Sequence, residues 1–191
     1  MNGRPRRGLA ASGGVAVGNA LVWSEPTAGA ADGDPVRALA AVAEELGRTA
    51  ERLRAEGRRQ EAEILEANRL IAEDPTLIAD VERLSRELSA GEALRSATET
   101  HADVLAALAD PLLAARATDV RQLGSRAIRI LEGAGAPLAS VTSILVAKDL
   151  GPADVAELRL GRGSIEGIAL AEGAVTSHAA IIARSQYTRR A

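Results

Sequence analysis

The stretch "SILVAKDLGPADVAEL", Ser143 to Leu158, contains the change of pattern that decides the fold class. Its opening letters, SILVAK, form a short apolar run typical of a buried strand, and Pro152 then opens a short helical segment. A second strand-like run, "SIEGIALA", occupies Ser164 to Ala171, and a further helix is expected from about Ser177. The order strand, helix, strand, loop, helix indicates an α/β unit.

The region from Asp34 to Gly133 has a different period, because its apolar residues recur at the three-four spacing of amphipathic helices. Five helices are predicted here, and their starts are marked by residues suited to helix N-caps. The predicted caps are Asp34, Asp74 and Asp110, each followed by proline, and Ser89, which with Glu92 makes a capping box. Gly133 is the predicted C-cap of the last helix. The short connections predict an antiparallel α-helical bundle.

The last two of these helices carry apolar stripes at helical spacing. The predicted apolar stripes are Leu94, Ala97, His101, Val104 and Leu108 on the fourth helix, and Leu113, Ala117, Val120, Ala127 and Leu131 on the fifth. His101 lies on such a stripe, so it is interpreted as a packed structural histidine.

An N-terminal run, Gly8 to Trp23, is rich in β-branched and small residues and is interpreted as a strand or hairpin. Because that strand needs a sheet to join, the helices are predicted to interrupt an α/β unit. The predicted boundaries are 1–23 and 140–191 for the α/β subdomain, 34–133 for the helical subdomain, and 24–33 and 134–139 for linkers. The polar, basic end after Arg184 offers no further strand, so the α/β subdomain is expected to be truncated.

Composition excludes several classes of function. The chain has 191 residues, no cysteine and a formal net charge of -3. It therefore lacks disulfides and thiolate metal sites, and two distant histidines do not make a zinc site; no metal is expected. The net charge gives no global attraction to nucleic acid or to anionic membranes. No apolar run approaches the roughly 18 residues of a membrane span and no signal peptide is evident, so a cytoplasmic location is expected.

The stretch "EGAVTSHAAIIAR", Glu172 to Arg184, holds the second histidine, His178. Gly173 permits a sharp turn, and Thr176 is the expected helix cap, which places Ser177 and His178 in the first helical turn. Free backbone N–H groups and the positive end of the helix dipole there favour a neutral imidazole and would stabilise a bound phosphoryl group. From the residues alone two interpretations stay open: a phosphoryl-carrying nucleophile, or a histidine that merely occupies a helix start. A serine-hydrolase site is disfavoured, because adjacent residues cannot form the nucleophile–base pair.

A family resemblance bears on this choice. "GAVTSHAAIIAR" resembles the phosphohistidine signature of enzymes that use phosphoenolpyruvate, and the other motifs resemble Enzyme I of the phosphoenolpyruvate:sugar phosphotransferase system. Those motifs are "GLAASGGVAVGNAL", "AEILEANRLIAEDPTL", "ATDVRQLGSR" and "ILVAKDLGPADVAEL", in that order. The resemblance implies an α/β phosphohistidine subdomain of the swivelling type with an inserted helical HPr-binding subdomain, where HPr is the histidine-containing phosphocarrier protein. It also implies that His178 takes the phosphoryl group of phosphoenolpyruvate on Nε2 and passes it to HPr, with Thr176 and Ser177 as loop or helix-cap support.

The same resemblance implies where HPr docks. The implied contact residues are Leu65, Glu66, Asn68, Ile71, Glu73, Asp74 and Arg116, with the acidic ones steering a basic partner. Packing in the core is the expected role of at least one of Leu65 and Ile71, and a solvated helix arginine is an equally good interpretation of Arg116.

The sequence departs from the family pattern near the histidine. A double glycine is replaced by Gly173-Ala174, an arginine by Val175, and a threonine that can hydrogen-bond the resting histidine by Val155. A histidine common on the docking helix is replaced by Asn68.

The family's C-terminal barrel, which binds phosphoenolpyruvate and magnesium, is absent from this sequence. The chain is therefore expected to be an N-terminal fragment without a cofactor of its own, able at most to exchange phosphoryl groups with phospho-HPr. Two alternatives are a non-catalytic helical docking module and the swivelling domain of an enzyme related to pyruvate phosphate dikinase.

Overall fold

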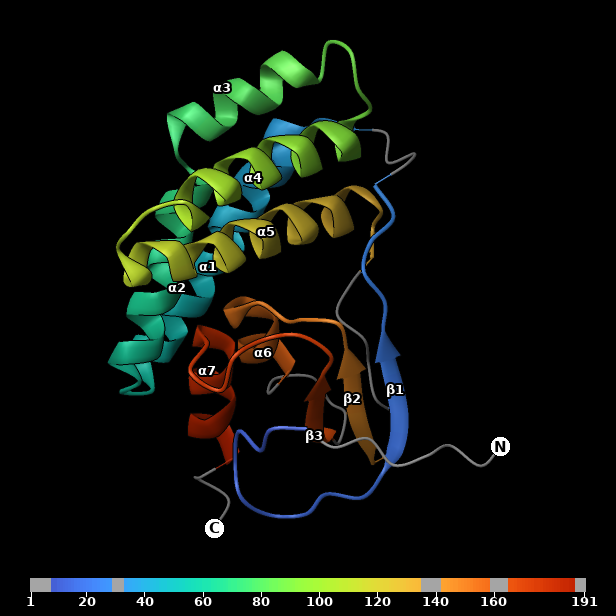
Figure 1. Cartoon of the computed structure of the whole chain (residues 1–191), viewed down its shortest axis with the longest axis vertical. Coiled ribbons are helices and arrows are strands. Elements are labelled where there is room, and N and C mark those ends of the chain that lie inside the picture. Colours follow the sequence, from blue (N-terminus) through green and yellow to red (C-terminus); the bar gives the residue numbers. More distant parts are fainter. Residues whose placement is uncertain (1–7, 29–32, 135–141, 159–164, 188–191) are drawn as a thin grey trace.

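The computed structural model describes residues 8–28, 33–134, 142–158 and 165–187. Its elements are β1 (Asn19–Trp23), α1 (Pro35–Ala55), α2 (Arg59–Ala72), α3 (Pro75–Leu84), α4 (Ala90–Ala106), α5 (Pro111–Leu131), β2 (Ser143–Ala147), α6 (Pro152–Leu158), β3 (Ile165–Leu170) and α7 (His178–Tyr187). The helices α1–α5, called the helical part, lie at one end of the molecule, and the strands with α6 and α7, called the sheet part, lie at the other (Figure 1).

The three strands form a parallel sheet in the order β1-β2-β3. Leu21 of β1 is in register with Leu145 of β2, which is in register with Ile168 of β3. β1 and β2 are neighbours in the sheet although all five helices of the helical part lie between them in the chain. The strand–helix–strand–loop–helix order predicted from Ser143 onward is confirmed.

The first strand is shorter than predicted. Only Asn19–Trp23 of the run from Gly8 to Trp23 is a strand, and it pairs with β2 rather than with a hairpin partner. The segment before it contains Gly14 at φ 107°, a conformation that interrupts an extended strand. The hairpin alternative is therefore wrong for the described residues.

The helix starts agree with the predicted caps. The Asp34 carboxylate accepts hydrogen bonds from the backbone N–H groups of Val36 and Arg37, at 3.0 and 3.1 Å. Asp74 and Asp110 cap α3 and α5 in the same way, and both bonds of the Ser89 capping box are present. At the other end of α5, Gly133 has a φ of 65°, as the predicted C-cap requires.

One buried hydrophobic cluster runs through both parts of the molecule. The largest of its fully buried side chains are Leu39, Leu46 and Leu53 of α1, Leu65 of α2, Leu77 of α3, Leu94 of α4, Ile128 of α5, Leu145 of β2 and Ile182 of α7. The helix α6 packs against α1 and α2, and α7 packs against α2, so the helices of the sheet part contact the helical part. No helix among the described residues is long and apolar enough to cross a membrane.

The predicted stripes of α4 and α5 are wrong at the connection between the two helices. Val104 is 63% exposed, Leu108 is 41% exposed and Leu113 is 47% exposed. Helical spacing shows which residues share a face, but full burial on that face ends at Ala102 on α4, with Leu105 partly buried, and resumes at Ala117 on α5. The last turns therefore project into solvent.

Candidate functional site

The loop after β3 places His178 at the first position of α7. Backbone N–H groups of Ala171 and Glu172 donate to the carbonyl oxygens of Ala147 and Lys148, which holds the loop against the end of β2. Gly173 has a φ of 116°, which an L side chain rarely adopts, so the predicted turn depends on glycine at this position.

The cap of α7 is Ser177, one residue later than predicted. The Ser177 hydroxyl oxygen accepts a hydrogen bond from the backbone N–H of Ala180, at 3.2 Å. The prediction that Thr176 caps this helix is wrong, because the backbone N–H of Ser177 turns back to Ala174 before the helix begins. Ala179 and Ile182 are buried and anchor α7 in the core.

A side chain of the helical part holds the imidazole of His178. Its Nδ1 lies 2.9 Å from Oδ2 of Asp119, a buried residue of α5. The His178 side chain remains 26% exposed, and Nε2 makes no hydrogen bond with any described residue. One ring nitrogen is thus fixed by a carboxylate, while the other is available to a reactant.

A second α5 residue shares the same carboxylate oxygen. Nη1 of Arg116 lies 3.2 Å from Oδ2 of Asp119, and the Arg116 side chain is 28% exposed. Arg116 therefore lies beside the histidine site and carries positive charge toward it, although the sequence suggested it only as an interface residue or a solvated arginine.

Four polar residues of α5, including Asp119, contact the sheet part. Asp119, Gln122, Arg126 and Arg129 recur at the helical spacing of three and four, and each contacts the sheet part. Gln122 donates to Asp149, which follows β2, over 2.8 Å. We call these four residues the α5 polar stripe.

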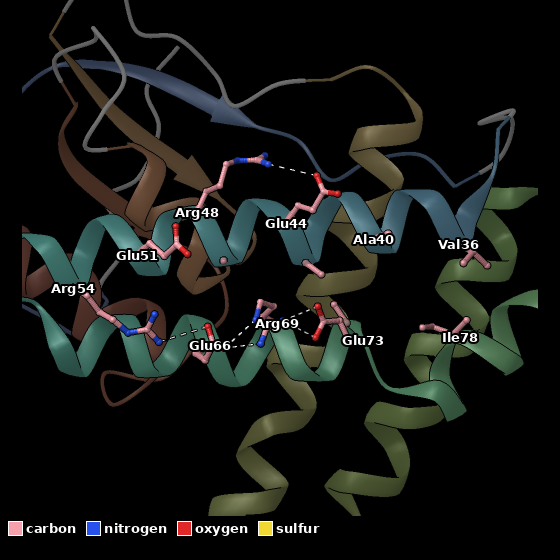
Figure 2. Close-up of a pocket in the computed structure, with 13 residues that line it drawn as sticks. Val36, Ala40, Glu44, Arg48, Glu51, Arg54, Glu66, Arg69, Glu73 and Ile78 are labelled. Atoms are coloured by element: carbon pink, nitrogen blue, oxygen red, sulfur yellow. Dashed lines mark hydrogen bonds and ion pairs between the residues drawn. The ribbon is translucent and has the colours of Figure 1, made fainter.

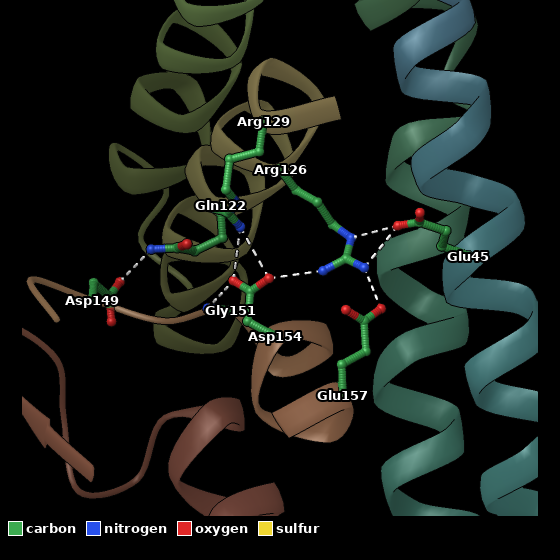
Figure 3. A network of polar contacts seen from close by, with 8 residues as sticks. All are labelled: Glu45, Gln122, Arg126, Arg129, Asp149, Gly151, Asp154 and Glu157. Carbon is green, nitrogen blue, oxygen red and sulfur yellow. Dashed lines mark hydrogen bonds and ion pairs between the residues drawn. The ribbon is translucent and has the colours of Figure 1, made fainter. Parts of the chain in front are cut away.

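The centre of the stripe is a buried ion-pair network (Figure 3). Arg126 pairs with Asp154 at 2.8 Å and with Glu45 at 2.7 Å, and it also contacts Glu157. Burial alone would lower the pKa of the Arg126 guanidinium, but the carboxylates of Asp154, Glu157 and Glu45 outweigh burial and raise it. Burial raises the pKa of the Glu157 carboxyl, even though Arg126 pulls it down.

Arg129 connects this network to the sheet. Its guanidinium lies 3.0 Å from Asp154 and 5.1 Å from the centre of the Trp23 ring on β1. The network therefore joins α1, α5, α6 and β1.

Two of the residues expected to contact a partner are buried. Leu65 is fully buried and Asn68 is 3% exposed, because both face the interior of the helical part. Direct contact of either side chain with a partner is therefore contradicted in this conformation. Ile71 is partly buried against the small cluster of Ala102, Ala117 and Val120.

The acidic candidates on α2 are accessible but paired with arginines. Arg69 lies 2.6 Å from Glu66 and 2.7 Å from Glu73, and Arg54 approaches Glu66 at 3.6 Å. The hydrogen bond from Arg69 lowers the pKa of the Glu66 carboxyl. Asp74 is engaged as the cap of α3. These pairs reduce the net negative charge that α2 presents, so acidic steering receives less support than the sequence suggested.

A groove of about 650 Å³ lies along the same pairs, between α1, α2 and α3 (Figure 2). Arginine and glutamate side chains line it in similar numbers, as the labelled Arg48, Arg54, Arg69, Glu44, Glu51, Glu66 and Glu73 show. Its charges compensate one another, and it does not include His178.

An exposed apolar patch lies where α4 meets α5, and the sequence analysis did not find it. It consists of Val104, Leu108, Leu112 and Leu113, of which Leu112 is 78% exposed. Leu112, Arg116 and Asp119 are four and three residues apart on α5, so they lie along one face of the helix. The patch is thus about 10 Å from Asp119 along the helix, at 1.5 Å per residue.

The described residues contain no group of three or more histidine, cysteine, aspartate or glutamate side chains able to hold a metal ion. The groups that meet at His178 are the imidazole, the Asp119 carboxylate, the Arg116 guanidinium and the N-terminus of α7.

The fold and the histidine loop together define a class of protein. Two solved structures are similar to this chain. The first is an Enzyme I structure (nEIt), with 31% sequence identity, a TM-score of 0.62 and coverage of 93% of this chain and 77% of that chain. The second is the N-terminal domain of Enzyme 1 - Nitrogen, with 29% identity, a TM-score of 0.63 and coverage of 92% of this chain and 77% of that chain. The chain thus has the fold of an Enzyme I N-terminal domain.

The sequence comparison assigns the family. The chain belongs to the PEP-utilising enzymes: the model of their N-terminal region matches residues 7–116, and that of their mobile domain matches residues 140–187.

Curated relatives are longer than this chain. The phosphoenolpyruvate-protein phosphotransferase of Bacillus subtilis (strain 168) is 30% identical over 94% of this chain and 34% of its own length. The multiphosphoryl transfer protein of Rhodobacter capsulatus is 36% identical over 65% of this chain and 15% of its own length. The chain therefore spans about a third or less of the relatives it matches.

Proposed function

We propose that the chain is a phosphoryl carrier of a phosphotransferase system, in which His178 accepts a phosphoryl group on its ring and delivers it to HPr. The observation that carries the proposal is the placement of His178. One ring nitrogen is bound to Asp119 at 2.9 Å, and the partly exposed ring stands at the N-terminus of α7.

The surroundings of the ring suit a phosphoryl group. Backbone N–H groups in the first turn of α7 and the positive end of its dipole favour a dianionic group there. Arg116 adds a positive side chain within reach of the same site. Transfer between two imidazoles requires positioning and charge stabilisation more than proton transfer, and these groups supply both.

The apolar patch is a candidate docking site for the acceptor protein. Exposed leucines and valines grouped at one end of a helix pair are typical of protein contact sites. A partner seated on Leu112 and Leu113 extends along α5, past Arg116, to His178. We therefore propose that HPr docks on the patch rather than on Leu65 and Asn68.

Because the chain spans only part of its relatives, the reaction proposed for it is exchange with phospho-HPr. Phosphoenolpyruvate and the magnesium expected for the full-length family enzymes belong to the C-terminal barrel that the resemblance implies.

The test is transfer of a radiolabelled phosphoryl group from phospho-HPr to the chain. Label on the wild type and on His101→Ala, with none on His178→Ala, is the expected result. Equal labelling of both variants contradicts the proposal.

A titration of labelled chain with HPr, followed by NMR chemical shifts, separates docking from transfer. Shifts confined to the α4–α5 connection and α2, weakened in Leu112→Ser, are expected. Binding of HPr without any phosphoryl transfer identifies a docking module and overturns the carrier role.

A further inference from the structure

The two histidines of the chain are bound to carboxylates through opposite ring nitrogens. His178 contacts Asp119 through Nδ1 at 2.9 Å, and His101 contacts Asp80 through Nε2 at 3.0 Å. Each of these aspartates also pairs with an arginine three residues away, Arg116 for Asp119 and Arg83 for Asp80. The two sites share this arrangement but differ in the nitrogen that is bound and in burial, since Asp119 is 6% exposed and Asp80 is 31% exposed.

The identity of the bound nitrogen determines where a neutral imidazole carries its proton. An ionised carboxylate can only accept a hydrogen bond, so the ring nitrogen facing it must be the N–H. For His178 the proton is then on Nδ1 and the free electron pair is on Nε2. For His101 the arrangement is reversed.

We infer that Asp119 is a positioning residue that makes Nε2 of His178 the nucleophilic nitrogen, by holding the proton on Nδ1 and fixing the ring. This inference rests on the proposed function of His178. Asp119 comes from the helical part, 59 residues away in the chain, so the helical part contributes to the site as well as to docking.

The step balances without any proton transfer. The Nε2 electron pair forms the new bond to phosphorus, while the bond from phosphorus to the donor breaks and leaves its electron pair on the donor atom. The Nδ1–H stays in place, and the positive charge that develops on the ring faces the Asp119 carboxylate. When the phosphoryl group moves on to the acceptor, the electron pair of the bond returns to Nε2, and the ring is again neutral.

Asp119 can hold the His178 ring in place because its own side chain is buried and hydrogen-bonded. Its side chain is 6% exposed, and Arg116 holds the same Oδ2 that meets His178. Gln122, one turn further on α5, fixes the helix to the loop after β2. The carboxylate therefore cannot turn away from the ring unless α5 moves relative to the sheet part.

The experiment measures the tautomer and the rate in the same proteins. Nitrogen-15 NMR of the histidine rings, at a pH where both are neutral, is recorded for the full chain, Asp119→Ala and the matched control Asp80→Ala. Label transfer from phospho-HPr is measured in parallel. In the wild type we expect Nδ1–H for His178 and Nε2–H for His101.

In Asp119→Ala the fixed tautomer of His178 should be lost. The transfer rate should fall on the order of 10- to 100-fold, the size of effect seen when the partner that orients a metal-binding histidine is removed. Asp80→Ala should change only the His101 signals and leave transfer unchanged. Asp119→Asn should restore the Nδ1–H form, because its amide oxygen can occupy the position beside Arg116, and should recover part of the rate.

The inference is overturned by Nε2–H on His178 in the wild type, or by an unchanged His178 tautomer in Asp119→Ala, whatever the rate of that variant. A purely structural role of Asp119 predicts that Asp119→Asn follows Asp119→Ala in rate while the His178 tautomer stays fixed in both. If the wild type accepts no label, the proposed function fails, but the NMR spectra still decide which nitrogen carries the proton.

Discussion

Replacing Arg126 with methionine tests whether the buried network joins the two parts of the molecule. The Arg126 side chain is 11% exposed and contacts Asp154, Glu45 and Glu157, which belong to α6 and α1. Methionine has a similar helix propensity and no charge, so the change removes the ion pairs without weakening α5 itself.

The expected loss of folding free energy depends on the partners that each carboxylate retains. Removing one partner of a buried pair typically costs about 3–5 kcal/mol. Asp154 retains Arg129 at 3.0 Å and the backbone N–H of Gly151 at 3.1 Å, while Glu45 and Glu157 are open enough to be hydrated. We therefore expect the low end of the range, about 3 kcal/mol, which corresponds to a fall in Tm of roughly 6–12 °C for a chain of this size.

Arg121→Met is the matched control on the same helix. Arg121 also makes two ion pairs, at 2.8 and 2.6 Å, but its partners Glu99 and Asp103 are 51% and 74% exposed. Exposed pairs contribute about 1 kcal/mol or less, so Tm should fall by no more than about 4 °C. Calorimetry and urea unfolding at pH 7 measure both variants. Equal losses in the two, or a loss below about 1 kcal/mol in Arg126→Met, would refute the reasoning.

Three further predictions concern packing, pH and capping. A side chain at Gly124 would overlap the Thr98 hydroxyl and lie 3.0 Å from Thr98 Cβ, so Gly124→Ala should cost about 1–3 kcal/mol. Adding Thr98→Ala should recover part of that loss in urea unfolding, and no recovery would show that the helices do not meet there. Burial raises the pKa of the Asp149 carboxyl, so its contribution to stability is greatest below the unfolded pKa, about 4, and is lost as pH rises through the folded pKa. Asp149→Asn should therefore gain stability relative to wild type between pH 4 and pH 7.5, and the opposite trend in urea midpoints would contradict the raised pKa of this partly buried carboxyl. Asp34→Ala removes the cap of α1 and should lower the free energy of unfolding by about 1 kcal/mol; an unchanged urea midpoint would exclude the capping role.

The elements that could be predicted from the sequence are those determined by residues close together in the chain. Asp34, Asp74, Asp110 and Ser89 cap the predicted helices because a carboxylate or hydroxyl reaches N–H groups only two or three residues away. The succession of strands and helices along the chain from Ser143 onward follows from the same short-range pattern. At α7 the local signal was ambiguous, because Thr176 and Ser177 are adjacent and both can cap.

The features that were not predicted depend on tertiary contacts. Helical spacing put Val104 and Leu108 on a buried stripe, but nothing local reveals that the neighbouring helices stop short of them. Asp119 reaches His178 across 59 residues, and no motif joins the two. A signal was present, since Asp119, Gln122, Arg126 and Arg129 form a polar stripe at helical spacing on α5. Such a stripe predicts a polar partner surface without identifying it.

A single helix, α5, connects the features that the proposed function needs. Its first turns carry Leu112 and Leu113 of the apolar patch, its middle carries Arg116 and Asp119, and its second half is fixed to the sheet part by Arg126 and Arg129. A shift of α5 along its axis would move the patch and the carboxylate together, so a partner docked on the patch would keep its alignment with Asp119 but lose it with His178. Variants of the network should therefore slow phosphoryl transfer more than they weaken HPr binding, whereas variants of the patch should do the reverse. That opposite pattern distinguishes an α5 that aligns the two sites from one that merely contributes to the core.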